Sequence, residues 1–130
     1  SKDILFVTTG IMTQECLEVV EKLKLRNIKA GVLHNTTIKP FDEASLIKAS
    51  KKTKLIFTVE EHIVSGGLGS TVLETLNKKN SSDITKVNRI GIDNVFVKKY
   101  GSQKDLLNYC GLSAKKIFAT VIKRIHEQKS

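Results

Sequence analysis

Residues 54–76 read KLIFTVEEHIVSGGLGSTVLETL, an apolar run followed by a polar turn, three glycines and a helical pattern. The run around Ile56 shows no apolar–polar alternation, which is typical of a strand covered on both faces of a parallel sheet. Leu68, Val72 and Leu76 then recur every four residues, which predicts a helix with one buried face. The segment therefore predicts a strand–turn–helix unit whose turn carries the polar residues.

Similar patterns recur along the whole chain and predict an α/β fold. Apolar runs at residues 3–8, 29–34 and 87–92 predict three more strands, and helical patterns lie between and after them. Strands that alternate with helices form a parallel sheet covered on both faces. We therefore expect residues 1–130 to form one domain, a three-layer α/β/α fold with a mainly parallel sheet of about four to five strands and helices on both faces.

Local signals predict the first two helices in more detail. A helix beginning near Met12 has an apolar face that includes Cys16, whereas Glu15 is expected to face water. Asp42 is well placed to cap a second helix that ends near Lys51, because its carboxylate can accept from a free backbone N–H group. Cys16 is therefore expected in the core.

The last part of the chain contains a polar segment and two helical patterns. Residues 77–85 are polar and predict a surface loop. A short helix is expected over residues 102–109, because Gly111 is the residue type that commonly ends a helix. Ser113 is then expected to cap a separate last helix, whose apolar residues recur at spacings of three and four.

The composition argues against several classes of protein. A net charge of +9 raises the possibility of nucleic-acid binding, but only three of the 22 basic residues are arginine and no aromatic ladder is present. No apolar run approaches the ~20 residues of a membrane span, and no segment has the stages of a signal peptide. Cys16 and Cys110 are too few and too far apart for a disulfide framework. We expect a cytoplasmic protein that binds neither nucleic acid nor a membrane.

The turn after the strand at residues 54–60 is the sharpest cluster of reactive residue types. If the first strand lies between the second and third, the crevice at the carboxyl ends of the strands falls between Thr8 and this turn. Glu60, Glu61 and His62 supply groups suited to acid–base chemistry or to a metal. Adjacent side chains of a strand point oppositely, however, so a hydrogen-bonded structural loop is the competing interpretation.

The glycines after this turn also allow two interpretations. Gly66, Gly67, Gly69 and Ser70 stand at a predicted helix start, where free N–H groups and the helix dipole can hold an anion. Their spacing matches neither a dinucleotide-binding loop nor a Walker loop. Alternatively, the helix packs so tightly against the sheet that only glycine fits.

Two motifs taken together resemble one protein family. The segments TIKPFD at residues 37–42 and TVEEHIVSGGLGS at residues 58–70 are similar to the C-terminal domain shared by transketolases, deoxyxylulose-phosphate synthases and 2-oxo-acid dehydrogenase beta subunits. The closing stretch from Arg89 to Ile117 fits in the same order, so the resemblance covers nearly the whole chain. The two motifs are most similar to those of bacterial and archaeal transketolases.

The resemblance implies an accessory role in a larger enzyme. Such enzymes transfer a two-carbon ketol unit between sugar phosphates of the pentose phosphate pathway, using thiamine diphosphate and Mg²⁺ that are held by other domains across a homodimer interface. The chain has neither the G-D-G motif nor the paired asparagines of the family's metal site. The resemblance thus implies a domain that has no catalytic residue, binds no cofactor or metal and is inactive alone. It also implies an interface or regulatory site toward the remaining domains or subunit, formed by Glu60, Glu61, His62, Gly66, Gly67, Gly69 and Ser70.

Two alternatives remain open at this point. The same domain also occurs in deoxyxylulose-phosphate synthases and 2-oxo-acid dehydrogenase beta subunits. A stand-alone module that binds an anion or nucleic acid is motivated by the charge of +9 and by the glycine turn. Because the only methionine is Met12, we expect either a clipped initiator before Ser1 or an excised part of a longer enzyme.

Overall fold

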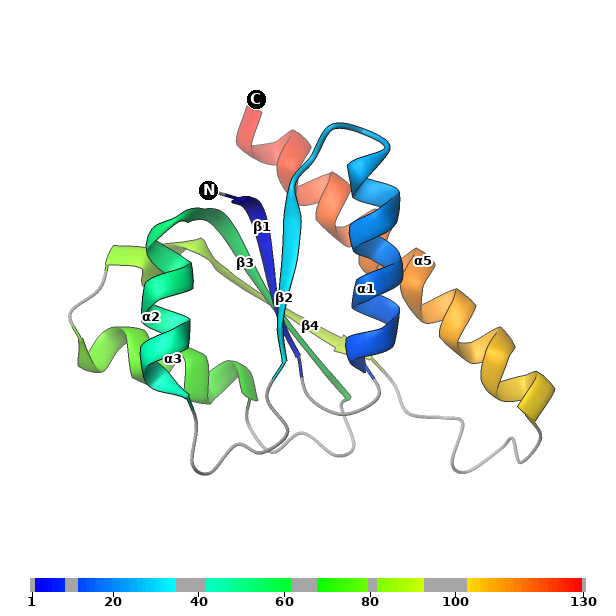
Figure 1. The fold of residues 1–130 in the computed structure, drawn as a ribbon, viewed down its shortest axis with the longest axis horizontal. Helices are drawn as coiled ribbons and strands as arrows, with labels where there is room; N and C mark the ends of the chain where they lie inside the picture. Colours follow the sequence, from blue (N-terminus) through cyan, green and yellow to red (C-terminus); the bar gives the residue numbers. More distant parts are fainter. Residues whose placement is uncertain are drawn as a thin grey trace.

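The computed structural model of the chain is a layered α/β structure in which a sheet separates two pairs of helices (Figure 1). It describes residues 2–8, 12–34, 42–61, 68–79, 82–92 and 103–129. Within these ranges, side chains are described except at positions 2, 12, 61, 85, 92, 103–113, 128 and 129.

Strands and helices alternate along the described chain. The elements are β1 (Lys2–Thr8), α1 (Met12–Lys24), β2 (Ala30–His34), α2 (Glu43–Lys51), β3 (Thr53–Glu61), α3 (Leu68–Lys78), the 3₁₀ helix η1 (Ser82–Lys86), β4 (Val87–Ile92) and α5 (Gln103–Lys129). The sheet has the order β2-β1-β3-β4 with every neighbouring pair parallel. This confirms the predicted parallel α/β fold, and the first strand lies between the second and third.

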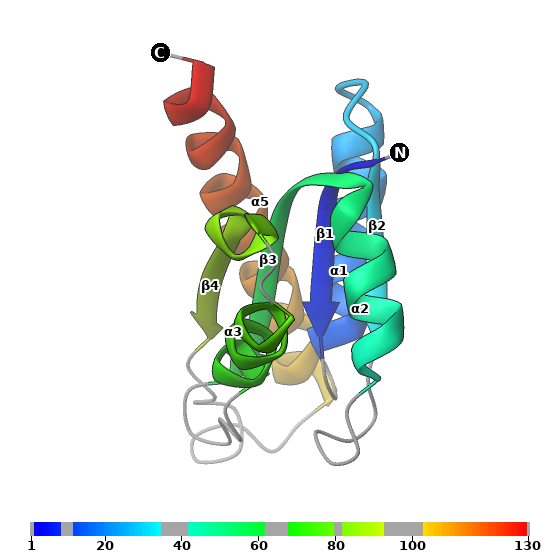
Figure 2. The ribbon, with the colours of Figure 1, turned by 90° about the vertical axis from the view of Figure 1, so that its left-hand side faces the viewer.

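A separate apolar core lies on each face of the sheet. Helices α1 and α5 cover one face, and α2 and α3 cover the other (Figure 2). Phe6 and Phe57 are register partners on the α1–α5 face, where their ring centroids lie 6.0 Å apart. Val7 follows Phe6 on β1, and Ile56 precedes Phe57 on β3. Both belong to the core on the α2–α3 face. Both central strands are thus apolar on both faces, which explains their unbroken apolar sequence.

The ends of two helices follow from local sequence. The Asp42 carboxylate accepts a hydrogen bond from the Ser45 backbone N–H at 3.1 Å, so the predicted cap of α2 is confirmed. After α1, Asn27 has a left-handed φ of 61°. The Ile28 N–H donates to the Leu23 carbonyl at 3.0 Å, and the Asn27 N–H donates to the Lys24 carbonyl, the pattern of a Schellman motif.

The prediction that Glu15 faces water is wrong. Only 2% of its surface is exposed, and its Oε2 atom has no hydrogen-bond partner among the described residues. Glu15 precedes the fully buried Val19 by four residues and Leu23 by eight, so the helical repeat places all three on the core face. Its position in the first turn of α1 partly offsets the cost of burial, because a helix N-terminus stabilises negative charge.

The predicted break near Gly111 is also wrong. Helix α5 runs without interruption from Gln103 to Lys129. A glycine inside a helix costs only about 1 kcal/mol, and packing of the buried Ala114, Ile117 and Val121 against the sheet outweighs that cost. The loop predicted over residues 77–85 is wrong at both ends, because α3 extends to Lys78 and η1 begins at Ser82.

Candidate functional site

The strand order reverses between β1 and β3. Helix α1 follows β1 onto one face of the sheet, whereas α3 follows β3 onto the other. The carboxyl ends of these strands, at Thr8 and Glu61, therefore flank the position where parallel sheets usually hold a site. The strand order therefore meets the condition on which the predicted crevice depends, and the crevice itself stays a prediction.

Glu60 connects three elements at this edge. Its side chain points toward α3 and is 11% exposed. Its Oε2 atom accepts a hydrogen bond from the Leu68 backbone N–H at 2.8 Å, which satisfies a free donor at the start of α3. Its Oε1 atom lies 3.3 Å from Nη2 of Arg89 on β4. Because both oxygens have partners, the structural interpretation of this carboxylate fits better than an acid–base role.

Gly69 lies directly against the Arg89 side chain. A Cβ atom at residue 69 would lie 2.2 Å from Nε and 2.9 Å from Cζ of Arg89. The guanidinium thus lies against the first turn of α3 and reaches Glu60 from there. At Gly69 the packing interpretation holds. Sequence reasoning missed the role of Arg89, because nothing in the sequence indicates that β4 and the start of α3 are adjacent.

A second polar group lies at the same end of the sheet. The hydroxyl groups of Thr8 on β1 and Thr13 on α1 are 2.8 Å apart, and Thr13 Oγ1 is hydrogen-bonded to His34 Nδ1 at 2.5 Å. His34 is the last residue of β2 and is exposed. The parallel register of β1 and β2 makes Thr8 and His34 direct partners, which brings this histidine to the end of β1.

The remaining predicted residues are only partly described. Ser70 is exposed in the first turn of α3, and the backbone of Glu61 ends β3. His62, Gly66 and Gly67 lie outside the described residues. In the part of the chain that the structure describes, no three His, Cys, Asp or Glu side chains gather as metal ligands. Among the described helices none is long and apolar enough to cross a membrane.

Cys16 is confirmed as a core residue. It is fully buried between α1 and the sheet. Burial, with a smaller contribution from the charge of Glu15, raises the pKa of its thiol to about 12. A thiol that stays protonated is a poor nucleophile, as expected of a core residue.

The comparison with known proteins identifies the family of the chain. A family model described as the transketolase C-terminal domain matches residues 1–117. The chain belongs to this family. The transketolase C-terminal domain, as we now call it, also resembles a solved structure titled split gene transketolase, inactive beta4 tetramer, with 34% sequence identity and a TM-score of 0.70. That match covers 94% of this chain and 39% of the solved one.

Curated relatives are longer than this domain. A transketolase family protein of Sinorhizobium fredii is 36% identical over 121 residues, which are 92% of this chain and 34% of the relative. A 1-deoxy-D-xylulose-5-phosphate synthase of Desulfitobacterium hafniense is 37% identical over 92 residues, which are 71% of this chain and 14% of the relative. The domain therefore spans about a third or less of the length of these relatives.

Proposed function

We propose that this transketolase C-terminal domain is the accessory domain of a thiamine-diphosphate-dependent enzyme that transfers a two-carbon ketol unit between sugar phosphates. In this proposal the enzyme is a cytoplasmic homodimer, and the cofactor with its Mg²⁺ is held by other domains, where it acts as the electron sink. The chain lacks the G-D-G motif and the paired asparagines of the family's metal site, so we assign no step of that chemistry to it. The role of the domain is packing, assembly or regulation.

The carboxyl edge of the sheet is the proposed contact with the remaining domains or subunit. The supporting observation is the Glu60 carboxylate, which binds both the Leu68 N–H and Arg89. These contacts hold the residues on either side of segment 62–67 against the sheet. A segment whose ends are already ordered loses less entropy when it binds a partner. We therefore propose that Glu61, His62 and the glycine turn make that contact.

The test uses the enzyme that contains this domain, whether as one polypeptide or as two subunits. Glu61→Lys is expected to raise the dissociation constant of the assembly at least about tenfold, because an unpaired charge at an interface is costly. Sedimentation measures assembly, and ketol transfer should fall at low enzyme concentration and recover at high concentration. The matched control is Glu18→Lys, the same charge change at an exposed position of α1.

Normal assembly and normal ketol transfer of the Glu61→Lys enzyme would exclude this edge as the contact. Loss of activity without any change in assembly would favour a regulatory or ligand-binding edge instead. If Glu18→Lys weakens assembly as much as Glu61→Lys, the effect comes from the net charge of the domain and the proposed contact is refuted.

A second candidate reaction is supported by the identity to a 1-deoxy-D-xylulose-5-phosphate synthase. The same full enzyme can be assayed for formation of 1-deoxy-D-xylulose 5-phosphate and for decarboxylation of 2-oxo acids. Formation of either product without ketol transfer would replace the first reaction while leaving the accessory role of the domain intact.

A further inference from the structure

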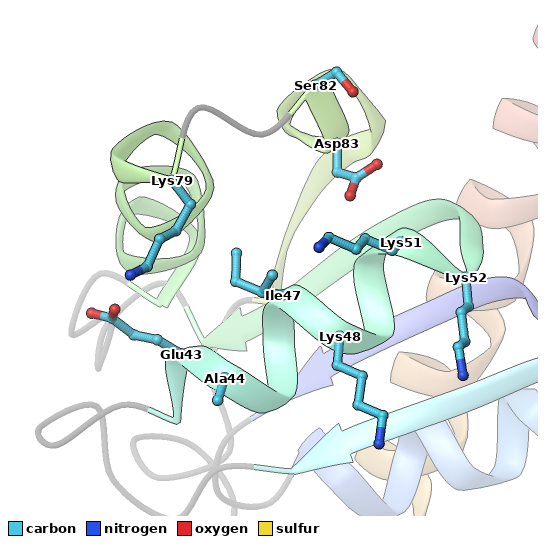
Figure 3. Close-up of a pocket in the computed structure, with 9 residues that line it drawn as sticks. All are labelled: Glu43, Ala44, Ile47, Lys48, Lys51, Lys52, Lys79, Ser82 and Asp83. Atoms are coloured by element: carbon cyan, nitrogen blue, oxygen red, sulfur yellow. The ribbon is translucent and has the colours of Figure 1, made fainter.

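A basic groove opens between α2 on one side and α3 with η1 on the other. It has a volume of about 1090 Å³ and lies on the α2–α3 face of the sheet (Figure 3). Four exposed lysines line it, namely Lys48, Lys51, Lys52 and Lys79. A hollow lined by charges of one sign concentrates the electrostatic potential and attracts counter-ions.

The two acidic residues of the groove do not neutralise these lysines. Glu43 pairs with Lys78, at 3.8 Å between Oε1 and Nζ. Asp83 is buried, with one oxygen 2.7 Å from Lys86 Nζ and the other accepting from the Ser50 hydroxyl at 3.1 Å. Within the described ranges, none of the four groove lysines has an ion-pair partner. The groove therefore carries positive charge that the domain itself does not compensate.

Two of the lysines form the centre of the groove. Lys51, at the end of α2, extends toward Ile47, whereas Lys79, just after α3, lines the other side of the groove and extends toward Glu43 (Figure 3). Lys48 and Lys52 project from α2 away from the space between the helices and add to its positive field. Ile47 lies between Lys51 and Lys79 in this view, and Ala44 also contributes apolar lining to the groove (Figure 3). The arrangement offers two separate cationic groups across a small apolar floor.

We propose that this groove binds a small, non-aromatic molecule that carries two or more phosphate groups, with Lys51 and Lys79 contacting different phosphates. A lysine ammonium is a compact charge that suits phosphate oxygens without the planar geometry that arginine imposes. Among the described residues that line the groove, none is aromatic and could stack on a nucleobase. Helices and η1, rather than a strand edge, form its walls, so an extended acidic peptide finds no backbone partner.

This proposal is independent of the proposed function. The groove is formed by α2, α3 and η1, whereas the proposed domain contact lies at the carboxyl ends of β1 and β3. An experiment that refutes the ligand groove therefore does not refute the proposed domain contact, and the reverse also holds.

The test is calorimetric titration of the 130-residue chain with inorganic pyrophosphate, inorganic phosphate and a hexose bisphosphate at constant ionic strength. Pyrophosphate and the bisphosphate are expected to bind at one site, at least about tenfold more tightly than phosphate, because the proposal gives each of their phosphates its own lysine. Lys51→Gln with Lys79→Gln should weaken pyrophosphate binding by at least about tenfold, because it removes two charge-assisted contacts and the loss of one alone is expected to cost about tenfold. Both side chains are exposed, so circular dichroism should show an unchanged fold.

The matched control is Lys115→Gln with Lys116→Gln, which removes the same charge from exposed positions of α5 across the sheet. It is expected to leave binding within twofold of the original chain. Equal weakening by both double variants would show that only the overall charge attracts phosphate and would overturn the proposal. So would pyrophosphate binding no tighter than phosphate. An oligo-glutamate peptide that binds more tightly than pyrophosphate and depends on Lys51 and Lys79 would replace the small ligand with a protein segment.

Discussion

Replacing Gly69 by alanine tests the contact between α3 and β4. The new Cβ would lie 2.2 Å from Arg89 Nε, about 1.2 Å closer than the 3.4 Å of an ordinary contact, so the guanidinium must move. When the guanidinium moves, it separates from Glu60. The Oε1 atom of this nearly buried side chain then loses its partner. Such a loss costs about 1–3 kcal/mol, whereas alanine stabilises a helix by about 0.5–1 kcal/mol relative to glycine. We expect Gly69→Ala to lower the free energy of unfolding in urea by about 0.5–2 kcal/mol.

A double-mutant cycle with Arg89→Ala isolates the cause of this loss. Without the guanidinium the new methyl group has room, so Gly69→Ala should become neutral or stabilising by up to about 1 kcal/mol. Ser70→Ala, at the neighbouring exposed position, should change stability by no more than about 0.5 kcal/mol. The reasoning is refuted if Gly69→Ala destabilises the domain equally with and without Arg89.

Three further predictions concern other described contacts. Glu60→Gln should lower the free energy of unfolding by about 1.5–3 kcal/mol and speed hydrogen exchange of the Leu68 amide, because the amide NH2 group replaces one of the two oxygens that accept from Leu68 and Arg89. Slow exchange in the variant would contradict this. Asn27→Ala should cost about 1–2 kcal/mol in thermal or urea unfolding, because φ there is 61°, while Asn27→Gly should cost less than about 0.5 kcal/mol; equal effects would rule out the left-handed conformation as the cause. With Cys110→Ser present, the Cys16 thiol should resist alkylation at pH 8 until the chain unfolds, since burial raises its pKa to about 12 from 9.0. As the pH rises, the thiol of the unfolded chain loses its proton before that of the folded chain, so the free energy of unfolding should fall between pH 9.0 and about 12, by up to about 1.4 kcal/mol per pH unit. Cys16→Ala should reduce this slope. An unchanged slope would refute the raised pKa of Cys16.

The candidate site was predictable in position but not in its contacts. The sequence placed Glu60 at the carboxyl end of a strand, and the sheet order puts that strand end where the strand order reverses. The partners of this carboxylate were not predictable, because Arg89 lies 29 residues away on a different strand. The hydrogen bond between Thr13 and His34 was missed for the same reason, because they lie 21 residues apart. Each depends on register between strands, which no local pattern encodes.

Sequence patterns alone determined the order and type of most elements. Unbroken apolar runs specify strands that are buried on both faces. Asp42 specifies the start of α2, because its carboxylate accepts a hydrogen bond from the nearby Ser45 backbone N–H. The motifs at residues 37–42 and 58–70 also pointed to the family that the comparison then established. All of these signals act between residues that are close in the chain.

Only the tertiary structure decided which polar residues are buried and which charges converge. Glu15 looked like a surface residue because its type is charged, yet the core face of α1 includes its position. Gly111 looked like a helix end, yet packing of α5 on the sheet carries the helix through it. Lys51 and Lys79 line one groove because α2 and α3 pack on the same face of the sheet. These outcomes depend on the free energy of packing between distant segments, which outweighs the preferences of single residues.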